Sequence, residues 1–389
     1  MTSGPRKLDT RLTHAGRDRK LTGGGVNPQI QRASTVLVES AEQLYAPGAW
    51  TYGRHGTATH EALKQALCEL EDASWCAVVS SGLLACTVPI LALAEPGAHF
   101  LVTDNAYGPT RRFFDRMLKR MGCEAEYFDP YIGAEVAAKF RTGATKAIFL
   151  ESPGSMTFEI SDAPAIAAVA RAAGVKTILD NTWAAGVYHR PLDLGIDISV
   201  QSTSKYIGGG ADLLGGYILT RDEALGARMK DTIADLGLSV PADDAYTVLR
   251  GLRSLTTRLQ RHGASGLDVA RWLETRPEVL RVLHPALEDD PNHALWKRDF
   301  TGASGLFGVV LKPAPTKAVH AFLDALELFG LGFSYGGFES LAIHCDPQLK
   351  RTVSRPKLGG PLLRFSIGLE DSDDLKADLA RGFAALASA

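Results

Sequence analysis

The sequence contains little cysteine, and its cysteines form no recognisable pattern. Five cysteines are scattered along 389 residues and never occur as a CxxC pair: Cys68, Cys76, Cys86, Cys123 and Cys345. This arrangement argues against a disulfide framework and against a structural zinc site. We therefore expect neither disulfide bonds nor a bound metal.

An excess of charge of one sign and long apolar runs are also lacking. The formal net charge is −2, which gives no electrostatic basis for binding nucleic acid or an acidic membrane. The longest apolar run, around Cys86–Ala94, is too short to span a bilayer. The chain starts without the apolar segment of a secretory signal, so we expect no signal peptide. These absences predict a cytoplasmic protein with neither nucleic-acid nor membrane partners.

The composition is that of a globular protein, with 45% hydrophobic and 22% charged residues. A chain of 389 residues predicts two or three domains. Residues 1–59 are irregular, and the run Gly23-Gly24-Gly25 lacks the preceding strand and following Gly-Lys of a phosphate loop. A flexible turn is the better interpretation of these glycines.

From residue 60 onward, short apolar runs alternate with stretches of helical periodicity. This pattern predicts a doubly wound α/β domain over residues 60–252, with a mostly parallel sheet covered by helices on both faces. This alternation becomes less regular after about residue 250, and we predict a smaller C-terminal α+β domain over residues 253–389. The expected strands are Phe100–Val102, Ala147–Leu150, Thr177–Leu179, Ile196–Val200, Tyr217–Leu219, Leu306–Leu311, Leu331–Phe333 and Leu363–Ile367.

Polar side chains follow several of the expected strands. Asp104, Glu151 and Asp180 each come at or just after the end of an apolar run. Ligands of open parallel sheets bind outside the carboxyl ends of the strands. These three positions are therefore expected to point toward one crevice.

Lys205 follows a run that is expected to be buried, which is unusual for a lysine. Burying an ammonium group costs several kcal/mol unless it is paired or neutralised. Formation of a Schiff base with an aldehyde cofactor removes this cost and activates the cofactor. The hydroxyls of Ser202 and Ser204 could bind a phosphate. The alternative is an ordinary lysine that extends to the surface at a strand end.

Two further features favour a phosphorylated pyridine cofactor, although each has a simpler interpretation. Asp180 could hold a proton on a pyridine nitrogen, or it could cap a helix. The turn Ser81-Gly82-Leu83 leads into a helical stretch, so its free N–H groups could bind a phosphate. It could equally be a common serine helix cap.

Taken together, ordered blocks along nearly the whole chain resemble the Cys/Met-metabolism family of pyridoxal 5'-phosphate (PLP) enzymes, which have the aspartate-aminotransferase (type I) fold. The blocks are Thr13-His14-Ala15-Gly16, Asn27-Pro28 with Ala33-Ser34-Thr35-Val36, Tyr52-Gly53-Arg54-His55-Gly56-Thr57, Ser80-Ser81-Gly82, Asp180-Asn181-Thr182-Trp183, Ser202–Tyr206 and Arg364–Glu370. Any one of these blocks alone would be a weak signal.

The resemblance implies a role for each matching residue. Lys205 would be the Schiff-base lysine and would move the Cα proton, with Tyr107 or Tyr52 as a further proton donor. Arg364 would bind the substrate α-carboxylate, and Ser334 and Tyr335 would line the substrate site. The implied cofactor-binding residues are Lys205, Asp180, Ser81, Gly82, Leu83, Ser202, Ser204, Tyr107, Tyr52 and Arg54.

The resemblance also implies an oligomer. Tyr52 and Arg54, in the segment 1–59, would reach the cofactor phosphate of a neighbouring subunit, and two dimers would form a homotetramer. Without the resemblance, Arg54 and Arg364 would be interpreted as ordinary surface arginines.

Within the family, two blocks resemble bacterial cystathionine β-lyases. They are the block from Glu151 to Glu159 and the turn that begins at Tyr107. The expected reaction is α,β-elimination of L-cystathionine to homocysteine, pyruvate and ammonia. Two positions depart from the pattern, since Tyr335 stands where tryptophan is common and Ser204 where threonine is frequent.

Three other functions remain open. The chain could be a β-lyase for cystine or another cysteine S-conjugate, to which the departure at Tyr335 would fit. It could be a cystathionine γ-lyase or γ-synthase on the same fold. A non-catalytic nucleotide-binding protein is the remaining alternative, although no GxGxxG follows a predicted strand.

Overall fold

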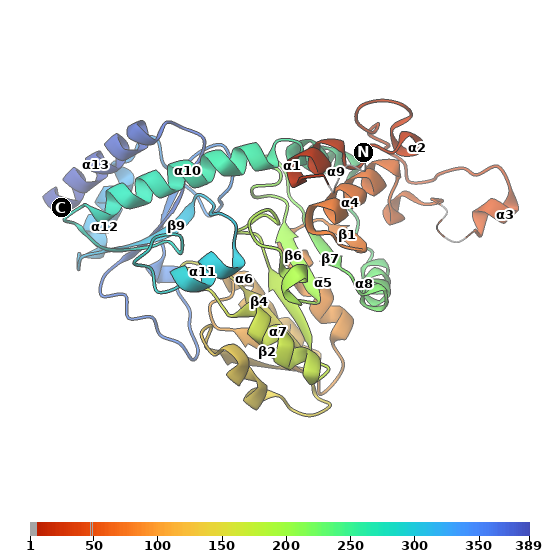
Figure 1. The fold of residues 1–389 in the computed structure, drawn as a ribbon, viewed down its shortest axis with the longest axis horizontal. Coiled ribbons are helices and arrows are strands. Elements are labelled where there is room, and N and C mark those ends of the chain that lie inside the picture. Colours follow the sequence, from red (N-terminus) through yellow and green to blue (C-terminus); the bar gives the residue numbers. More distant parts are fainter. Residues whose placement is uncertain (1–5, 47, 49) are drawn as a thin grey trace.

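The computed structural model describes residues 6–46, 48 and 50–389. Residues 1–5, 47 and 49, which belong to the predicted N-terminal segment, lie outside this part. Figure 1 shows a central sheet, a second sheet toward the C-terminus and an N-terminal arm that extends away from both. Among the described residues, no helix has the length and apolar character needed to cross a membrane.

The central sheet has seven strands in the order β1-β7-β6-β5-β4-β2-β3. Neighbouring strands are parallel except for β7, which is antiparallel to both β1 and β6. The predicted mostly parallel sheet is therefore confirmed. The strands are β1 (Trp75–Val79), β2 (His99–Thr103), β3 (Glu124–Phe128), β4 (Thr145–Glu151), β5 (Lys176–Asp180), β6 (Ile198–Ser202) and β7 (Gly216–Thr220).

Helices cover both faces of this sheet because successive strand residues point in opposite directions. Ile178 packs into the cluster that includes α5 and α8, whereas its neighbour Leu179 packs into the cluster that includes α7. The helical elements around the sheet are α4 (Ala58–Glu71), α5 (Gly82–Leu93), α6 (Gly108–Phe113), η2 (Phe114–Leu118), η3 (Gly133–Lys139), α7 (Ala163–Ala172), η4 (Pro191–Leu194), α8 (Glu223–Asp235) and α9 (Ala242–Leu252).

The C-terminal part forms a five-stranded sheet in the order β10-β11-β12-β9-β8. Side chains from α10, α12 and α13 form one core with this sheet, and the other side of β9 packs against Met156, Phe158 and Trp183. The elements are α10 (Leu255–Glu274), β8 (Val279–Leu283), α11 (His293–Asp299), β9 (Leu306–Leu311), α12 (Thr316–Asp324), β10 (Gly330–Leu331), β11 (Leu341–His344), η5 (Asp346–Gln348), β12 (Leu362–Ser366) and α13 (Ser372–Ser388).

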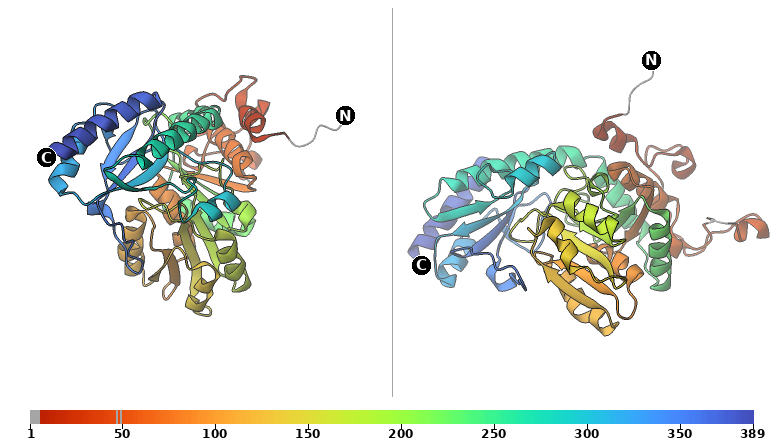
Figure 2. Two further views of the ribbon diagram at one scale, coloured as in Figure 1. Left: turned by 60° about the vertical axis from the view of Figure 1, so that its left-hand side comes forward. Right: turned by 60° about the horizontal axis from the view of Figure 1, so that its bottom comes forward.

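The N-terminal arm contains α1 (Leu8–His14), α2 (Arg19–Thr22), α3 (Ala41–Leu44) and η1 (Gly53–His55). Figure 2 shows that the part around α3 projects away from the rest of the chain. Large apolar side chains on this arm face solvent, including Leu37 at 89% and Tyr45 at 84% exposure. An exposed apolar arm of this kind is typical of an association surface.

The sequence located most strands but missed some and shifted others. Strands β1, β3, β8 and β11 were not predicted, and β6 begins at Ile198 rather than Ile196. The side chain of Asp197 accepts hydrogen bonds from the backbone N–H and hydroxyl of Thr177, which ties this residue to the start of β5. The domain boundaries after residues 59 and 252 stay a prediction.

Candidate active site

Two predicted carboxylates meet at the carboxyl ends of neighbouring strands. Glu151 of β4 and Asp180 of β5 are direct partners in the sheet register. The Asp180 carboxylate accepts hydrogen bonds from the Thr182 hydroxyl at 2.6 Å and the Thr182 backbone N–H at 3.0 Å. Burial raises the pKa of both carboxyls, and for Glu151 the negative charge of Asp180 raises it further. A cation bound between Glu151 and Asp180 would offset the free-energy cost of burying their negative charges.

Lys205 lies three residues beyond the end of β6, on the same edge of the sheet. Its Nζ donates a hydrogen bond to the Ser334 hydroxyl at 2.9 Å and lies 5.0 Å from the centre of the Tyr335 ring. Burial lowers its pKa to about 8, with a further lowering from the charge of Arg364. A pKa of about 8 leaves part of the amine in its neutral, nucleophilic form at physiological pH.

Arg364 connects the C-terminal sheet to this group. It lies on β12, is only 8% exposed, and donates a hydrogen bond to the Ser334 carbonyl at 3.3 Å. Its guanidinium carbon is 5.9 Å from the centre of the Tyr335 ring. The Tyr335 ring thus contacts both cations, Lys205 and Arg364. Arg364 also lines a small cavity that contains Asp180 and Glu151.

The predicted phosphate-binding turn lies against the end of β6. Ser81 caps α5 by accepting a hydrogen bond from the Leu84 backbone N–H at 3.1 Å. A Cβ atom at Gly82 would lie only 2.5 Å from Ser202 Cβ, so only glycine permits this close approach. The Ser204 hydroxyl accepts a hydrogen bond from the Gly215 backbone N–H at 3.1 Å. The structure therefore brings Ser81, Gly82 and Ser202 together.

Tyr107 lies immediately before α6 and on the same edge of the sheet. Its backbone N–H donates a hydrogen bond to Glu151 Oε2 at 2.6 Å. The ring is 44% exposed, so one side is open to a ligand. Burial, together with the negative charge of Glu151, raises the pKa of the Tyr107 phenol and keeps it protonated at neutral pH.

Tyr52 and Arg54 lie elsewhere in the chain. Tyr52 pairs with Thr35 in an isolated bridge of the N-terminal arm, and Arg54 donates a hydrogen bond to the Ala234 carbonyl at 3.2 Å. No hydrogen bond within the described ranges joins either residue to Lys205 or Asp180. Within a single chain, these two residues are therefore not part of the group around Lys205.

Two site residues were not identified from the sequence. The Thr182 hydroxyl donates to Asp180 and accepts from the Ser202 backbone N–H at 3.0 Å, so it links two strand ends. The Cys86 thiol donates a hydrogen bond to Asp180 Oδ2 at 3.4 Å. The block Asp180-Asn181-Thr182-Trp183 contained a signal for Thr182, but nothing in the sequence pointed to Cys86, which comes from another element.

Asp104 lies at the expected edge of the sheet but serves another purpose. Its wholly buried carboxylate accepts hydrogen bonds from the backbone N–H groups of Thr352, Val353 and Ser354 and from Arg111. The expectation that Asp104 points into the crevice is therefore wrong, and its carboxylate has a structural role instead. It holds a loop of the C-terminal part against the central sheet.

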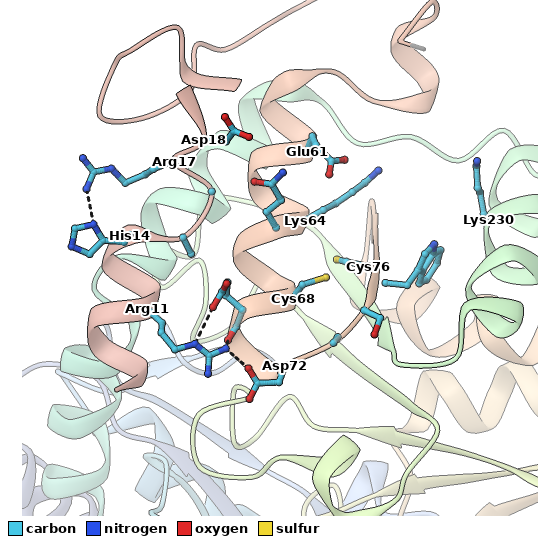
Figure 3. A pocket seen from close by; sticks show the side chains of 17 residues that line it. Arg11, His14, Arg17, Asp18, Glu61, Lys64, Cys68, Asp72, Cys76 and Lys230 are labelled. Atoms are coloured by element: carbon cyan, nitrogen blue, oxygen red, sulfur yellow. Dashed lines mark hydrogen bonds and ion pairs between the residues drawn. The ribbon is translucent and has the colours of Figure 1, made fainter. Parts of the chain in front are cut away.

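A separate hollow of about 970 Å³ lies beside α1 and α4 (Figure 3). Arg11 forms ion pairs with Glu69 and Asp72 in its wall, and Cys68 and Cys76 lie deeper within it. None of the predicted cofactor-binding residues lines this hollow. It therefore does not compete with the group around Lys205 as the place of a cofactor.

The residues around Lys205 fit PLP. Lys205 supplies an amine of lowered pKa, and Asp180 supplies a buried carboxylate that needs a cationic partner such as a protonated pyridine. The Ser81-Gly82 turn supplies the start of α5, where free N–H groups favour a phosphate. The close approach of Gly82 to Ser202 adds a hydroxyl next to this helix start.

Comparison with known proteins agrees with this fit. The family model described as Cys/Met metabolism PLP-dependent enzyme matches residues 9–384. The chain belongs to this family. PLP is accordingly its cofactor, and the type I fold predicted from the sequence is confirmed.

Similar proteins span nearly the whole chain. A putative cystathionine β-lyase of Rhizobium johnstonii is 50% identical over 383 residues, which cover 97% of this chain and 96% of that protein. The cystathionine β-lyase MetC of Escherichia coli K12 is 44% identical, with 97% and 98% covered. The crystal structure of metB from Corynebacterium glutamicum superposes with a TM-score of 0.91 at 31% identity, with 97% and 98% covered.

Proposed function

We propose that this chain is a carbon–sulfur β-lyase that cleaves L-cystathionine to homocysteine, pyruvate and ammonia. The observation that carries the proposal is the arrangement around Lys205. An amine of lowered pKa donates to the Ser334 hydroxyl and faces the Tyr335 ring, and the charges of Arg364 and Asp180 both influence its pKa. Relatives at 50% and 44% identity that bear the name cystathionine β-lyase support β-cleavage over other reactions of the family.

Residue roles follow from this arrangement. Lys205 would hold the cofactor covalently through Nζ, Asp180 would face its pyridine nitrogen, and Tyr107 would stack on its ring. The phosphate would bind at the start of α5 and the end of β6, through Ser81, Gly82, Leu83, Ser202 and Ser204. When bound, PLP supplies an electron sink for negative charge at the substrate Cα.

The protein's own groups handle substrate and protons. Arg364 would bind the planar α-carboxylate with its guanidinium, and Ser334 and Tyr335 would complete this end of the site. Lys205 Nζ would take the proton from Cα, since its lowered pKa favours the neutral amine. The protonated Tyr107 phenol, whose pKa is raised, would give a proton to the leaving sulfur, a role that Lys205 could share.

We further propose that each site is completed by a second chain and that two dimers form a homotetramer. Tyr52 and Arg54 are the residues that would cross to the partner's cofactor phosphate. The exposed apolar side chains of the N-terminal arm support such an association, since a lone chain would leave them in water. We also propose a cytoplasmic location, to which the five free cysteines are suited.

Product identification tests the proposed reaction. The holoenzyme is incubated separately with L-cystathionine, L-cystine and L-methionine, and keto acids are identified by mass spectrometry. We expect pyruvate and homocysteine from cystathionine and little product from methionine. If 2-oxobutyrate is the keto acid formed from cystathionine, the reaction is γ-cleavage and the proposal is wrong.

The role of Lys205 is tested separately with Lys205→Ala and Lys205→Arg. Both variants should lose the absorbance band of covalently bound PLP, and β-cleavage should fall by about 10²–10⁴-fold or more, as when a catalytic acid–base is removed. The control is Lys176→Ala, a lysine at the opposite end of β5. An unchanged absorbance band in Lys205→Ala would contradict the assignment.

A further inference from the structure

A second cavity adjoins the proposed active site, and Tyr107 is one of its lining residues. This groove, of about 1000 Å³, has α6 and η2 on one wall and residues 347–356 on the other. Met156 lines both the groove and the small cavity that contains Asp180 and Arg364. The groove therefore continues outward from the proposed site.

The groove is strongly basic. Its basic residues are Arg111, Arg112, Arg116, Lys350, Arg351 and Arg355, and Asp115 is its one acidic residue. Arg111 is paired with Asp104, and Arg351 lies 3.4 Å from Glu159. In the described part of the chain, no ion pair or side-chain hydrogen bond is formed by the other four basic residues. The Asp115 carboxylate accepts a hydrogen bond from the Tyr127 hydroxyl at 2.7 Å.

The two walls of the groove are fixed to one another. Asp104 is 0% exposed and bonds the backbone of Thr352, Val353 and Ser354 on one wall and the Arg111 guanidinium on the other. Arg111 also donates to the Thr352 hydroxyl at 2.6 Å. The loop with Lys350 and Arg355 is thus held opposite the helix with Arg112 and Arg116. This arrangement is a formed concavity, whereas isolated surface charges would be independent of one another.

We propose that this groove binds the leaving-thiol part of the substrate and favours cysteine S-conjugates whose leaving thiol carries a carboxylate, as the homocysteine part of L-cystathionine does. The inference rests on the proposed β-lyase function, in which Tyr107 protonates the leaving sulfur. Tyr107 lines the groove, so the leaving group departs along it. Four unpaired cations in a concave site attract an anion and raise its local concentration.

The bond changes are those of β-elimination, and the groove adds no chemical step. The Cα–H bond and the Cβ–S bond break, and a Cα–Cβ double bond forms from the electron pair of the Cα–H bond. The Cα proton passes to Lys205, and the sulfur leaves with the electron pair of the Cβ–S bond and takes a proton. The distal carboxylate of the leaving thiol stays ionised throughout. Its contribution is to binding and orientation beside Arg112 and Arg116.

A pair of substrates that differ only in charge tests the proposal. The holoenzyme is assayed for pyruvate release from S-(2-carboxyethyl)-L-cysteine and from its neutral amide, S-(2-carbamoylethyl)-L-cysteine. We expect kcat/KM to favour the acid by at least about 10-fold at low salt, the lower end of electrostatic steering effects. The preference should shrink in 1 M salt because exposed charges are screened.

Substitutions in the groove test whether the preference for the acid over the amide arises there. In Arg112→Gln with Arg116→Gln, the acid-to-amide ratio of kcat/KM should fall toward one, with the loss arising mainly in KM. The matched control is Lys312→Gln with Lys317→Gln, which removes the same charge from exposed positions outside the groove and should retain the wild-type ratio. Retained PLP absorbance shows that each variant is folded and loaded.

Two outcomes would overturn the proposal. One is a wild-type ratio at or below one, and the other is a ratio that the Arg112 and Arg116 substitutions leave unchanged. Failure of the underlying β-lyase function has a different signature, namely no pyruvate from either conjugate or from L-cystathionine. Pyruvate from cystathionine without a preference for the acid would reject the groove proposal alone.

Discussion

Lys205 has a lowered pKa because of its surroundings, whereas an exposed lysine would be almost fully protonated at neutral pH. Burial removes water from the ammonium, and Arg364 adds a repulsive positive charge, so that the pKa falls from 10.5 to about 8. The negative charge of Asp180 acts in the opposite direction but is the weaker influence. Arg364, which we propose binds the substrate carboxylate, therefore also lowers the pKa of Lys205.

This pairing predicts the pH dependence of cofactor attachment. In the apoenzyme, the rate of covalent PLP attachment should rise with pH and reach half its maximum near pH 8, since only the neutral amine attacks the aldehyde. In Arg364→Gln, the midpoint should move to higher pH. Stopped-flow absorbance measures this rate from about pH 6 to about pH 10, a range that brackets the pKa of Lys205. A midpoint that Arg364→Gln leaves in place would contradict this coupling.

The same shift has a consequence for stability, with a definite sign. Between pH 8 and 10.5 the unfolded chain holds the Lys205 proton and the folded apoenzyme does not. The free energy of unfolding therefore receives a contribution from Lys205 that increases with pH across this window.

Thr182 is predicted to hold the strand ends of the site together. Thr182→Val keeps the shape of the side chain, removes the donor to Asp180 and leaves the Ser202 N–H without its acceptor. We expect the free energy of unfolding to fall by about 1–3 kcal/mol, as for a buried polar group without a partner. Urea unfolding measures this loss, and PLP affinity should fall as well. Thr182→Ser restores the hydroxyl and should recover both properties; equal losses in the two variants would point to packing instead.

At the scale of elements, the loop of residues 351–354 is held in position by one buried carboxylate, that of Asp104. Asp104→Asn removes the charge opposite Arg111 and part of the acceptor capacity for three backbone N–H groups. Removing one partner of a buried pair predicts a loss of about 3–5 kcal/mol in the free energy of unfolding. Limited proteolysis should then cleave near residues 349–357 sooner than in the wild-type chain.

The control for Asp104 is an exposed ion pair. Arg141→Gln breaks the exposed pairs with Glu124 and Glu126 and should change the free energy of unfolding by less than about 1 kcal/mol. If Asp104→Asn lowers the free energy of unfolding by no more than Arg141→Gln does, Asp104 does not anchor the loop.

At the scale of the whole molecule, Tyr52 and Arg54 do not join the group around Lys205 within one chain. If they complete a neighbour's site, two inactive variants should restore each other. Lys205→Ala and Arg54→Ala, each inactive alone, should regain part of the wild-type β-cleavage after subunits are mixed and exchanged, because some mixed dimers contain one intact site. Sedimentation measures the assembly, and the double variant on one chain, mixed with itself, is the control. No recovery, despite verified mixed dimers, would contradict the proposal that Arg54 completes a neighbour's site.

Some parts of this protein follow from sequence alone. The alternation of apolar runs and helical periods predicted the parallel sheet, because buried strands need apolar residues on both faces. Asp180 and Lys205 were recognisable because a charged residue at the end of a buried strand is costly without a function. The ordered blocks predicted the family and its cofactor, and the family match confirms both. The roles of Lys205, Asp180 and the other site residues stay predictions.

Other features depend on contacts between distant segments, which no local pattern encodes. Strand β3 carries glutamates at its exposed start, and its pairing with β2 defines it as a strand. The approach of Gly82 to Ser202, the Thr182 link and the lowered pKa of Lys205 beside Arg364 each require the chain to be folded. The sequence by itself therefore determined the fold class and the cofactor, and it predicted Lys205 as the Schiff-base lysine. Only the tertiary structure decided that the pKa of Lys205 is lowered and that a basic groove lies beside the proposed site. Burial and the proximity of charges are properties of the packed molecule.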